Sequence, residues 1–86
     1  TTDQLLLSLS SAELKANYPH DALKHIELAI SMYPSNPQLY ANRAYAYIAL
    51  NNTNAACEDL QRLDDMGYIS EDPILLDPCK NRKKKR

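Results

Sequence analysis

Apolar residues in the second half of this 86-residue sequence repeat those of the first half at a constant offset of 34 positions. The matched pairs are Ala22 with Ala56, Ile26 with Leu60, and Ala29 with Leu63. Within each set the residues recur at i, i+4 and i+7, a spacing that lines one face of an α-helix. The sequence therefore predicts two copies of one helical unit, neither of which can bury its apolar face alone.

Composition and breaker residues predict an all-α chain with four helices. The sequence has one Gly and long stretches of good helix formers such as Ala, Leu, Glu and Lys. Prolines at 19, 34 and 37, an asparagine-rich turn at 51–54, and Gly67 divide these stretches. The predicted helices run from about Thr2 to Ala16, His20 to Tyr33, Pro37 to Leu50, and Thr53 to Met66. Ser35 or Asn36 is expected to cap the third helix.

Each predicted helix carries an apolar face at helical spacing. The first is expected to bury Leu5, Leu9, Ala12 and Ala16, and the second Ala22, Ile26, Ala29, Ile30 and Tyr33. The third is expected to bury Tyr40, Ala44, Tyr47 and Ile48, and the fourth Ala56, Leu60 and Leu63. Beyond Gly67, the apolar run Ile74-Leu75-Leu76 predicts a short fifth helix or strap at about 70–78 that caps the fourth helix.

The third and fourth helices together resemble a tetratricopeptide repeat, a 34-residue antiparallel helix hairpin. Tyr40, Ala44 and Tyr47 stand at the family's aromatic, small and tyrosine positions, and Ala56 and Leu60 at its A-x3-F pair. In the first copy Ala22, Ile26, Ala29 and Pro34 fit the second half of the pattern. The resemblance implies a short α-solenoid of stacked hairpins, with repeats at about 3–36 and 37–68 inside a helical domain of residues 1–79.

The first helix fits this pattern in two registers. Without a gap, Leu6, Leu9 and Ser10 match, and Glu13 falls where the family has its tyrosine. With a one-residue insertion near Tyr18-Pro19, Ala12 takes that place instead. Tyr68 stands where the second repeat would close with a proline.

In the family, the first helix of each repeat lines a concave groove that holds peptides or partner helices. By resemblance, Gln38, Asn42, Tyr45 and Ala49 should face this groove, with Gln4, Ser8 and Ser11 as further contributors. Asn42 lies in an Asn-Arg-Ala stretch that resembles chaperone-binding repeats, where the asparagine helps to hold a terminal carboxylate. Leu7 and Ser11 occupy two other positions of that clamp, and the sequence holds no third repeat. The implied function is a protein-interaction adaptor, with a chaperone cofactor that binds a heat-shock chaperone tail as an alternative.

Charge is distributed unevenly along the sequence. Residues 1–79 hold all eleven acidic side chains and four of the ten basic ones. The remaining six form a basic tail, predicted to be flexible: Lys80, Arg82, Lys83, Lys84, Lys85 and Arg86. Such a cluster can be a nuclear import signal, a contact to nucleic acid, or a solvated boundary of a longer protein. A chain this short is also expected to be part of a larger protein or an oligomer, and a homodimer through its uncovered end faces is a further alternative.

Catalytic, metal and membrane functions are not expected. Adjacent carboxylates such as Asp64 and Asp65 point about 100° apart on a helix, and His20 and His25 about 140° apart, so neither pair converges on one ligand. No cofactor or metal is predicted, and no apolar run approaches the roughly 20 residues of a membrane span. Cys57 and Cys79 are too few for a disulfide framework, which favours a reducing compartment, the cytoplasm or the nucleus.

Overall fold

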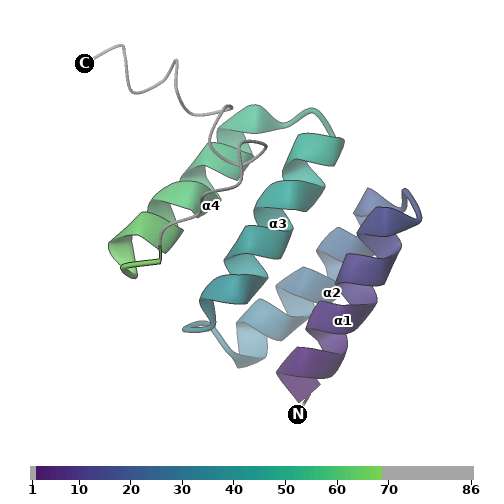
Figure 1. Ribbon diagram of the computed structural model, residues 1–86, viewed down its shortest axis with the longest axis horizontal. Helices are drawn as coiled ribbons and strands as arrows, with labels where there is room; N and C mark the ends of the chain where they lie inside the picture. Colours follow the sequence, from purple (N-terminus) through teal and green to yellow (C-terminus); the bar gives the residue numbers. More distant parts are fainter. Residues whose placement is uncertain (1, 69–86) are drawn as a thin grey trace.

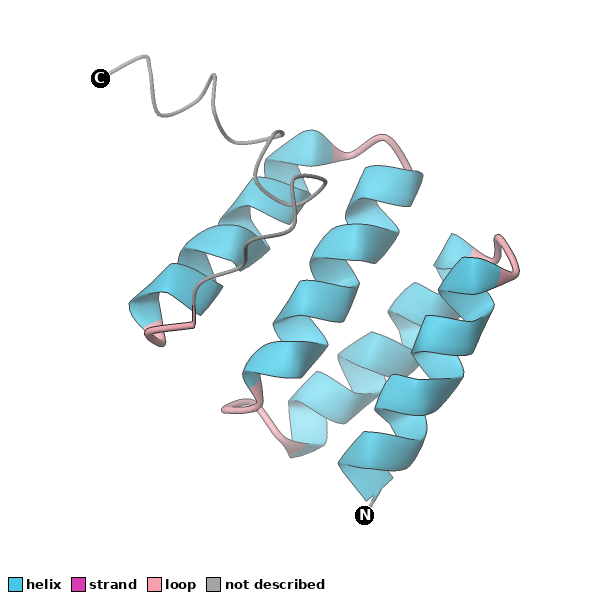
Figure 2. Cartoon of the chain, in the orientation of Figure 1, coloured by secondary structure: helices cyan, strands magenta, loops and turns pink. Residues whose placement is uncertain are grey.

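The computed structural model describes residues 2–68, which form four α-helices joined by short loops and contain no strand (Figure 2). The helices are α1 (Thr2–Lys15), α2 (Pro19–Met32), α3 (Pro37–Ala49) and α4 (Thr53–Asp65). The predicted all-α class is confirmed, and the four predicted helices agree with these bounds to within one residue. The cap expected at 70–78 and the basic tail at 80–86 lie outside the described residues.

Three of the four helices end in the same way, with one residue of positive φ. These residues are Asn17 (φ 70°), Asn51 (φ 65°) and Gly67 (φ 80°), and the two asparagines are 34 positions apart. The amide that follows each one donates to a carbonyl five residues earlier, at 2.7, 2.8 and 2.9 Å. This is the Schellman arrangement, which Gly and Asn favour because they tolerate left-handed geometry.

The starts of α3 and α4 are capped by asparagine side chains. Asn36 Oδ1 accepts a hydrogen bond from the Gln38 amide at 3.0 Å, which settles the predicted choice between Ser35 and Asn36. Asn52 Oδ1 accepts from the Ala55 amide at 3.3 Å. Proline occupies the first turn of α2 and of α3, where its missing N–H has no helical partner to lose.

The helices form an open row of two hairpins (Figure 1). Neighbours in sequence pack against one another, and α3 also packs against α1. Among the described helices, α4 contacts α3 but neither α1 nor α2. A closed four-helix bundle would bring the first and last helices together, whereas here α1 and α4 lie at opposite ends of the row.

Small residues lie where the helices approach most closely. Ala44 of α3 and Ala56 of α4 have no exposed surface and form one cluster inside the second hairpin. Ala46, on another side of α3, packs with Ala22 and Ile26 of α2 and joins the two hairpins. The predicted role of Ala44 and Ala56 as the seam of one hairpin is therefore confirmed.

Burial on the last three helices follows the prediction closely. Ala22, Ile26, Ala29, Tyr40, Ala44, Ala56 and Leu63 are buried, and Ile30, Tyr33, Tyr47, Ile48 and Leu60 are half-buried. The prediction missed Leu39, Ala46, Cys57 and Asp59, which are also buried.

The predicted buried face of α1 is wrong. Leu5 is 72% exposed and Leu9 43% exposed, and Ala12 and Ala16 are exposed as well. The buried side centres instead on Ser10, whose Oγ donates to the Leu7 carbonyl at 2.9 Å.

Ser10 lies 34 positions before Ala44, so α1 adopts the register without a gap. A small residue is required at both positions because each lies where its helix meets a neighbour. The five leucines of α1 are distributed around several sides of the helix, so apolar spacing alone could not identify which side is buried.

Candidate functional site

The residues predicted to line the binding groove lie on two helices that contact each other, and we call them the α1–α3 face. It consists of Gln4, Ser8 and Ser11 on α1 and of Gln38, Asn42, Tyr45 and Ala49 on α3. Gln4, Ser8, Gln38 and Ala49 are exposed, while Ser11, Asn42 and Tyr45 are half-buried. None of the seven carries a charge, so the face offers amide, hydroxyl and aromatic groups.

Asn42 holds the two helices of this face together. Its Nδ2 donates to Ser11 Oγ at 2.9 Å and to Ser10 Oγ at 3.1 Å, and lies 3.4 Å from the Leu7 carbonyl oxygen. A side-chain amide has two N–H donors, so these three acceptors on α1 engage its full donor capacity. A ligand carbonyl or carboxylate would have to displace them to reach the Asn42 amide.

The positions that resemble the chaperone carboxylate clamp are brought together, but with a different chemistry. Leu7 contributes a backbone carbonyl and Ser11 a hydroxyl, and both accept from Asn42. Neither supplies the cation that would neutralise a terminal carboxylate. The hydrogen bonds from Asn42 to α1 instead fix the spacing between α1 and α3.

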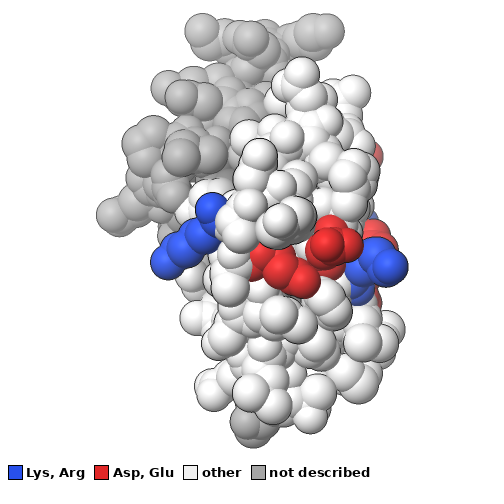
Figure 3. All heavy atoms as spheres, turned by 90° about the vertical axis from the view of Figure 1, so that its right-hand side faces the viewer, with Lys and Arg blue, Asp and Glu red and all other residues white. Residues whose placement is uncertain are grey.

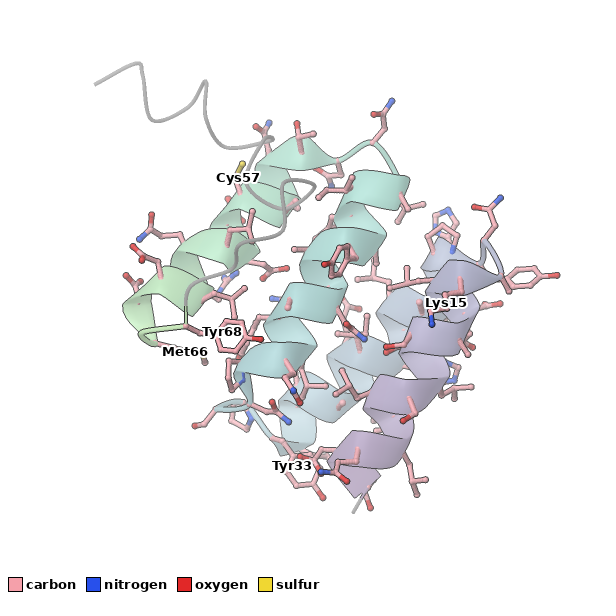
Figure 4. All side chains as sticks on the ribbon, viewed as in Figure 1. Lys15, Tyr33, Cys57, Met66 and Tyr68 are labelled. Carbon is pink, nitrogen blue, oxygen red and sulfur yellow. The ribbon has the colours of Figure 1, made fainter. Side chains whose placement is uncertain are left out.

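Lys15 extends the α1–α3 face and was missed by the sequence prediction. It follows Gln4, Ser8 and Ser11 at helical spacing, and it is exposed near the end of α1 (Figure 4). It is the counterpart of Ala49 at the 34-residue offset, a signal that could have identified it from the sequence. Tyr45, in contrast, packs partly against the cluster of Ala44 and Ala56, which limits its freedom to turn toward a ligand.

Behind this face, the second hairpin contains a buried ion network around Asp59, which has no exposed surface. Asp59 accepts two hydrogen bonds from Arg43, at 2.9 Å from Nε and 2.8 Å from Nη2. A third comes from Arg62 Nη1 at 2.9 Å. The Arg43 guanidinium also lies 5.5 Å from the ring centroid of Tyr40 and 6.0 Å from that of Tyr47. Both carboxylate oxygens accept hydrogen bonds, and the two from Arg43 link α3 to α4.

The network perturbs the protonation of its members. Hydrogen bonding to Asp59 raises the pKa of Arg43 above its ordinary value, although burial acts in the opposite direction. Burial raises the pKa of Tyr47 above its ordinary value, while the charge of Arg43 opposes that shift. Arg43 therefore stays charged and Tyr47 stays neutral at any physiological pH.

The first hairpin has a polar contact at the corresponding positions. His25 Nδ1 lies 2.8 Å from Glu13 Oε1, and these residues are the counterparts of Asp59 and Tyr47 at the 34-residue offset. His25 is half-buried and paired with Glu13 of α1, whereas His20 is exposed.

Other candidate residues form no second site in the described part of the chain. Within residues 2–68 there is no cluster of His, Cys, Asp and Glu that could hold a metal ion, and no helix long and apolar enough to cross a membrane. Asp64 and Asp65 are exposed, and Asp65 accepts a hydrogen bond from Gln61 at 3.2 Å. Cys57 is disulfide-bonded, which the sequence analysis did not predict. Cys79, Glu71, Asp72 and the basic tail from Lys80 to Arg86 lie outside the described residues.

Comparisons of this chain with protein-family models, with curated proteins and with solved structures find no match.

Proposed function

We propose that this chain is a protein-interaction module that binds an extended peptide or a helix of another protein on the α1–α3 face. The observation that carries the proposal is the contact between α1 and α3, which places exposed polar residues of both helices side by side on one surface. The 34-residue repeat and the open row of helices support the resemblance to tetratricopeptide repeats, whose first helices serve this purpose. In this proposal the protein has no catalytic role.

The chemistry of the face favours an uncharged partner segment. Gln4 and Gln38 present exposed amides that can both donate to and accept from a peptide backbone. Ser8 and the Tyr45 ring add a hydroxyl and an aromatic surface, and Lys15 is the one cation at the edge of this set. A chaperone tail ending in several carboxylates calls for more than one cation, so a polar, uncharged peptide or helix suits this face better.

Asn42→Ala is a poor probe of binding, because it also removes the hydrogen bonds that hold α1 and α3 together. Ala49→Glu is a better one, since Ala49 is exposed at the end of α3 and a glutamate there adds bulk and charge to the face. Ala12→Glu is the matched control: it makes the same change at an exposed position of α1 outside the face.

The test is an affinity capture with the 86-residue chain as bait, followed by titration of the recovered segment into isotope-labelled protein. Binding on the face should shift the backbone amide signals of Gln38, Asn42, Tyr45 and Ala49. Ala49→Glu should weaken binding at least about tenfold, which corresponds to roughly 1.4 kcal/mol, and Ala12→Glu should leave it unchanged. Amide shifts confined to other surfaces, or equal losses in both variants, would refute the proposal.

Two of the alternative functions rest on residues that the described part of the chain does not include. Nucleic-acid binding and nuclear import would both act through Lys80 to Arg86, and location in the cytoplasm or nucleus stays a prediction. Homodimerisation also stays a prediction.

A further inference from the structure

The loop between α3 and α4 holds a short motif that the proposed function does not use. Asn51-Asn52-Thr53 is an Asn-x-Thr sequence with a residue other than proline in the middle, which is the acceptor pattern for N-linked glycans. The other asparagines of the sequence have Pro, Gln, Ala, Asn or Lys two positions later, so none of them fits the pattern. Because a three-residue motif also arises by chance, the place of Asn51 in the fold decides whether it can serve as an acceptor.

The side chain of Asn51 is available for modification. Asn51 is exposed, and none of the hydrogen bonds within residues 2–68 involves its side chain. Its backbone forms the turn instead, with a φ of 65° and an amide that donates to the Ile48 carbonyl at 3.0 Å. The turn therefore depends on the Asn51 backbone and leaves the side-chain amide in solvent.

The structure explains Asn52 but gives Thr53 no structural task. Asn52 caps α4, because its Oδ1 accepts from the Ala55 amide, and its own amide donates to the Tyr47 carbonyl at 2.8 Å. Thr53 is the exposed first residue of α4, and its hydroxyl makes no hydrogen bond within the described residues. A threonine is therefore not needed here to start the helix.

The first repeat shows which part of the motif the fold itself requires. Asn17 lies 34 positions before Asn51, is exposed, and has the same left-handed backbone with a φ of 70°. It is followed by Tyr18-Pro19, so no hydroxyl side chain stands at the third position. Backbone geometry thus accounts for an asparagine at both places, whereas Thr53 is particular to the second.

The redox state of the chain points to the compartment in which N-linked glycans are added. Cys57, which lies on α4 close to this loop (Figure 4), is disulfide-bonded and 6% exposed. Disulfides persist in oxidising, secretory compartments and are rare where thiols are kept reduced. This bond favours an oxidising compartment over the cytoplasm or nucleus that the cysteine count predicts. The motif and the disulfide are independent features, and both belong to the same compartment.

We propose that Asn51 is a site of N-linked glycosylation, with a lipid-linked oligosaccharide diphosphate as the donor. Nδ2 of Asn51 forms a bond to the anomeric carbon of the first sugar, and the bond from that carbon to the diphosphate oxygen breaks. The lipid diphosphate leaves with the electron pair of that bond, and the proton that Nδ2 loses passes to a base. No atom is oxidised or reduced. Thr53 supplies the hydroxyl that completes the acceptor motif.

The loop offers room for an oligosaccharide. It lies at the end of the molecule opposite the N-terminus (Figure 1). Figure 3 keeps this end uppermost, and the Lys, Arg, Asp and Glu side chains visible in that view lie in a band across the middle. Residues 49–54 carry no charge, so a glycan here would separate no ion pair. It would add bulky, polar surface beyond the ends of α3 and α4.

The primary test expresses the 86-residue chain behind a cleavable secretion signal in eukaryotic cells and follows its gel mobility in extract and medium. Treatment with peptide-N-glycosidase should shift the band by one oligosaccharide and leave an aspartate where Asn51 stood, which peptide mass spectrometry detects. Asn17 controls for spontaneous deamidation and should remain asparagine. Thr53→Val, which keeps the shape of the side chain without its hydroxyl, should abolish the shift, and Thr53→Ser should retain it.

Two outcomes of this experiment would overturn the proposal. One is a chain that carries no oligosaccharide in either extract or medium, and the other is a mobility shift that survives in Thr53→Val. Circular dichroism of the purified Thr53→Val chain should show the helix content and melting temperature of the parent, so a lost shift is not a loss of fold. Ala49→Glu leaves the motif intact, so glycosylation succeeds or fails independently of partner binding on the α1–α3 face.

A second measurement uses the protein isolated from its natural source. Peptide mapping should find Asn51 converted to aspartate only after glycosidase treatment, and Cys57 of the denatured chain should react with an alkylating reagent only after reduction. An unmodified Asn51 in this material would overturn the proposal. If Cys57 then reacts before reduction, the predicted location in the cytoplasm or nucleus is the one supported.

Discussion

A carboxylate without exposed surface must find donors for its lone pairs inside the protein, and Asp59 does so through two arginines. Arg43 binds it from α3 with two hydrogen bonds, and Arg62 adds a third from α4. Arg43 also lies against the rings of Tyr40 and Tyr47, which ties the ion pair to the aromatic part of the hairpin. Because the side chains of Asp59 and Arg43 are largely shielded from water, the loss of Asp59 leaves the Arg43 charge without its partner.

Asp59→Asn should therefore be strongly destabilising. We expect the free energy of unfolding to fall by about 3 kcal/mol, because the asparagine keeps the shape but leaves the Arg43 charge uncompensated. Urea denaturation followed by circular dichroism measures the change. The control is Asp64→Asn on the exposed side of the same helix, expected within about 0.5 kcal/mol of the parent chain. Similar losses in the two variants would contradict the buried network.

Tyr47 gives the stability a dependence on alkaline pH. Its pKa is raised in the folded state, so the folded chain keeps the phenol proton at a pH where the unfolded chain has begun to lose it. This contribution to stability is complete below the unfolded-state pKa of about 10 and is lost as the pH rises through the folded-state pKa.

Tyr47→Phe should flatten the decline of stability above about pH 10, because the phenylalanine does not titrate. Denaturation curves at a series of pH values measure this decline. Tyr18→Phe, at a tyrosine that is 59% exposed, is the control and should decline like the parent chain. A decline in Tyr47→Phe as steep as in the parent would show that Tyr47 does not cause it.

At the scale of the helices, each hairpin is built around a position that admits only a small side chain. Ser10 and Ala44 occupy this position on the first helix of the two hairpins, and Ala22 and Ala56 occupy it on the second. All four have no exposed surface. In α1 the hydroxyl of Ser10 is accommodated because it donates to the Leu7 carbonyl and accepts from Asn42. Helices can approach closely here because no long side chain separates their backbones.

Ala44→Leu should overpack the seam between α3 and α4. We expect a loss of about 1–3 kcal/mol in the free energy of unfolding, seen as a lower melting temperature. The matched substitution Ala49→Leu lies at an exposed position of the same helix and should change stability by less than about 0.5 kcal/mol. Unchanged melting of Ala44→Leu would count against the close contact between Ala44 and Ala56.

At the scale of the whole molecule, the proposed α1–α3 face differs in charge from the basic tail. The face is polar, with Lys15 as its one cation, whereas the tail holds six basic residues. A partner bound on the face should therefore respond to ionic strength differently from one bound through the tail. Salt screens charged contacts strongly and leaves apolar and uncharged polar contacts largely intact.

Affinity for a partner on the α1–α3 face should depend only weakly on salt. With Lys15 as the single cation, the slope of log affinity against log salt should lie between 0 and about −1, measured from 50 to 500 mM salt. Nucleic acid bound through six basic tail residues would give a slope of about −5 and lose its binding in a chain that ends at Cys79. A steep slope for a peptide partner would contradict the uncharged character assigned to this face.

The sequence by itself determined the helices, their ends and the seam of the second hairpin. Prolines, asparagines and Gly67 act on the backbone within a few residues, so their effects can be read locally. Asn17 and Asn51 illustrate this, since each ends a helix with positive φ at equivalent places of the repeat. The pairing of Ala44 with Ala56 was also predictable, because both stand at small-residue positions of the repeat pattern that the sequence resembles.

Only the tertiary structure decided which side of α1 is buried and what the polar residues contact. Leucines lie on several sides of α1, so the positions of α2 and α3 determined that Ser10 is buried and Leu5 is exposed. Arg43 and Asp59 are 16 residues apart, and Asn42 and Ser11 are 31 apart. Spacing within one helix gives no information about such pairs, because the packing of helices against each other determines which side chains meet across them.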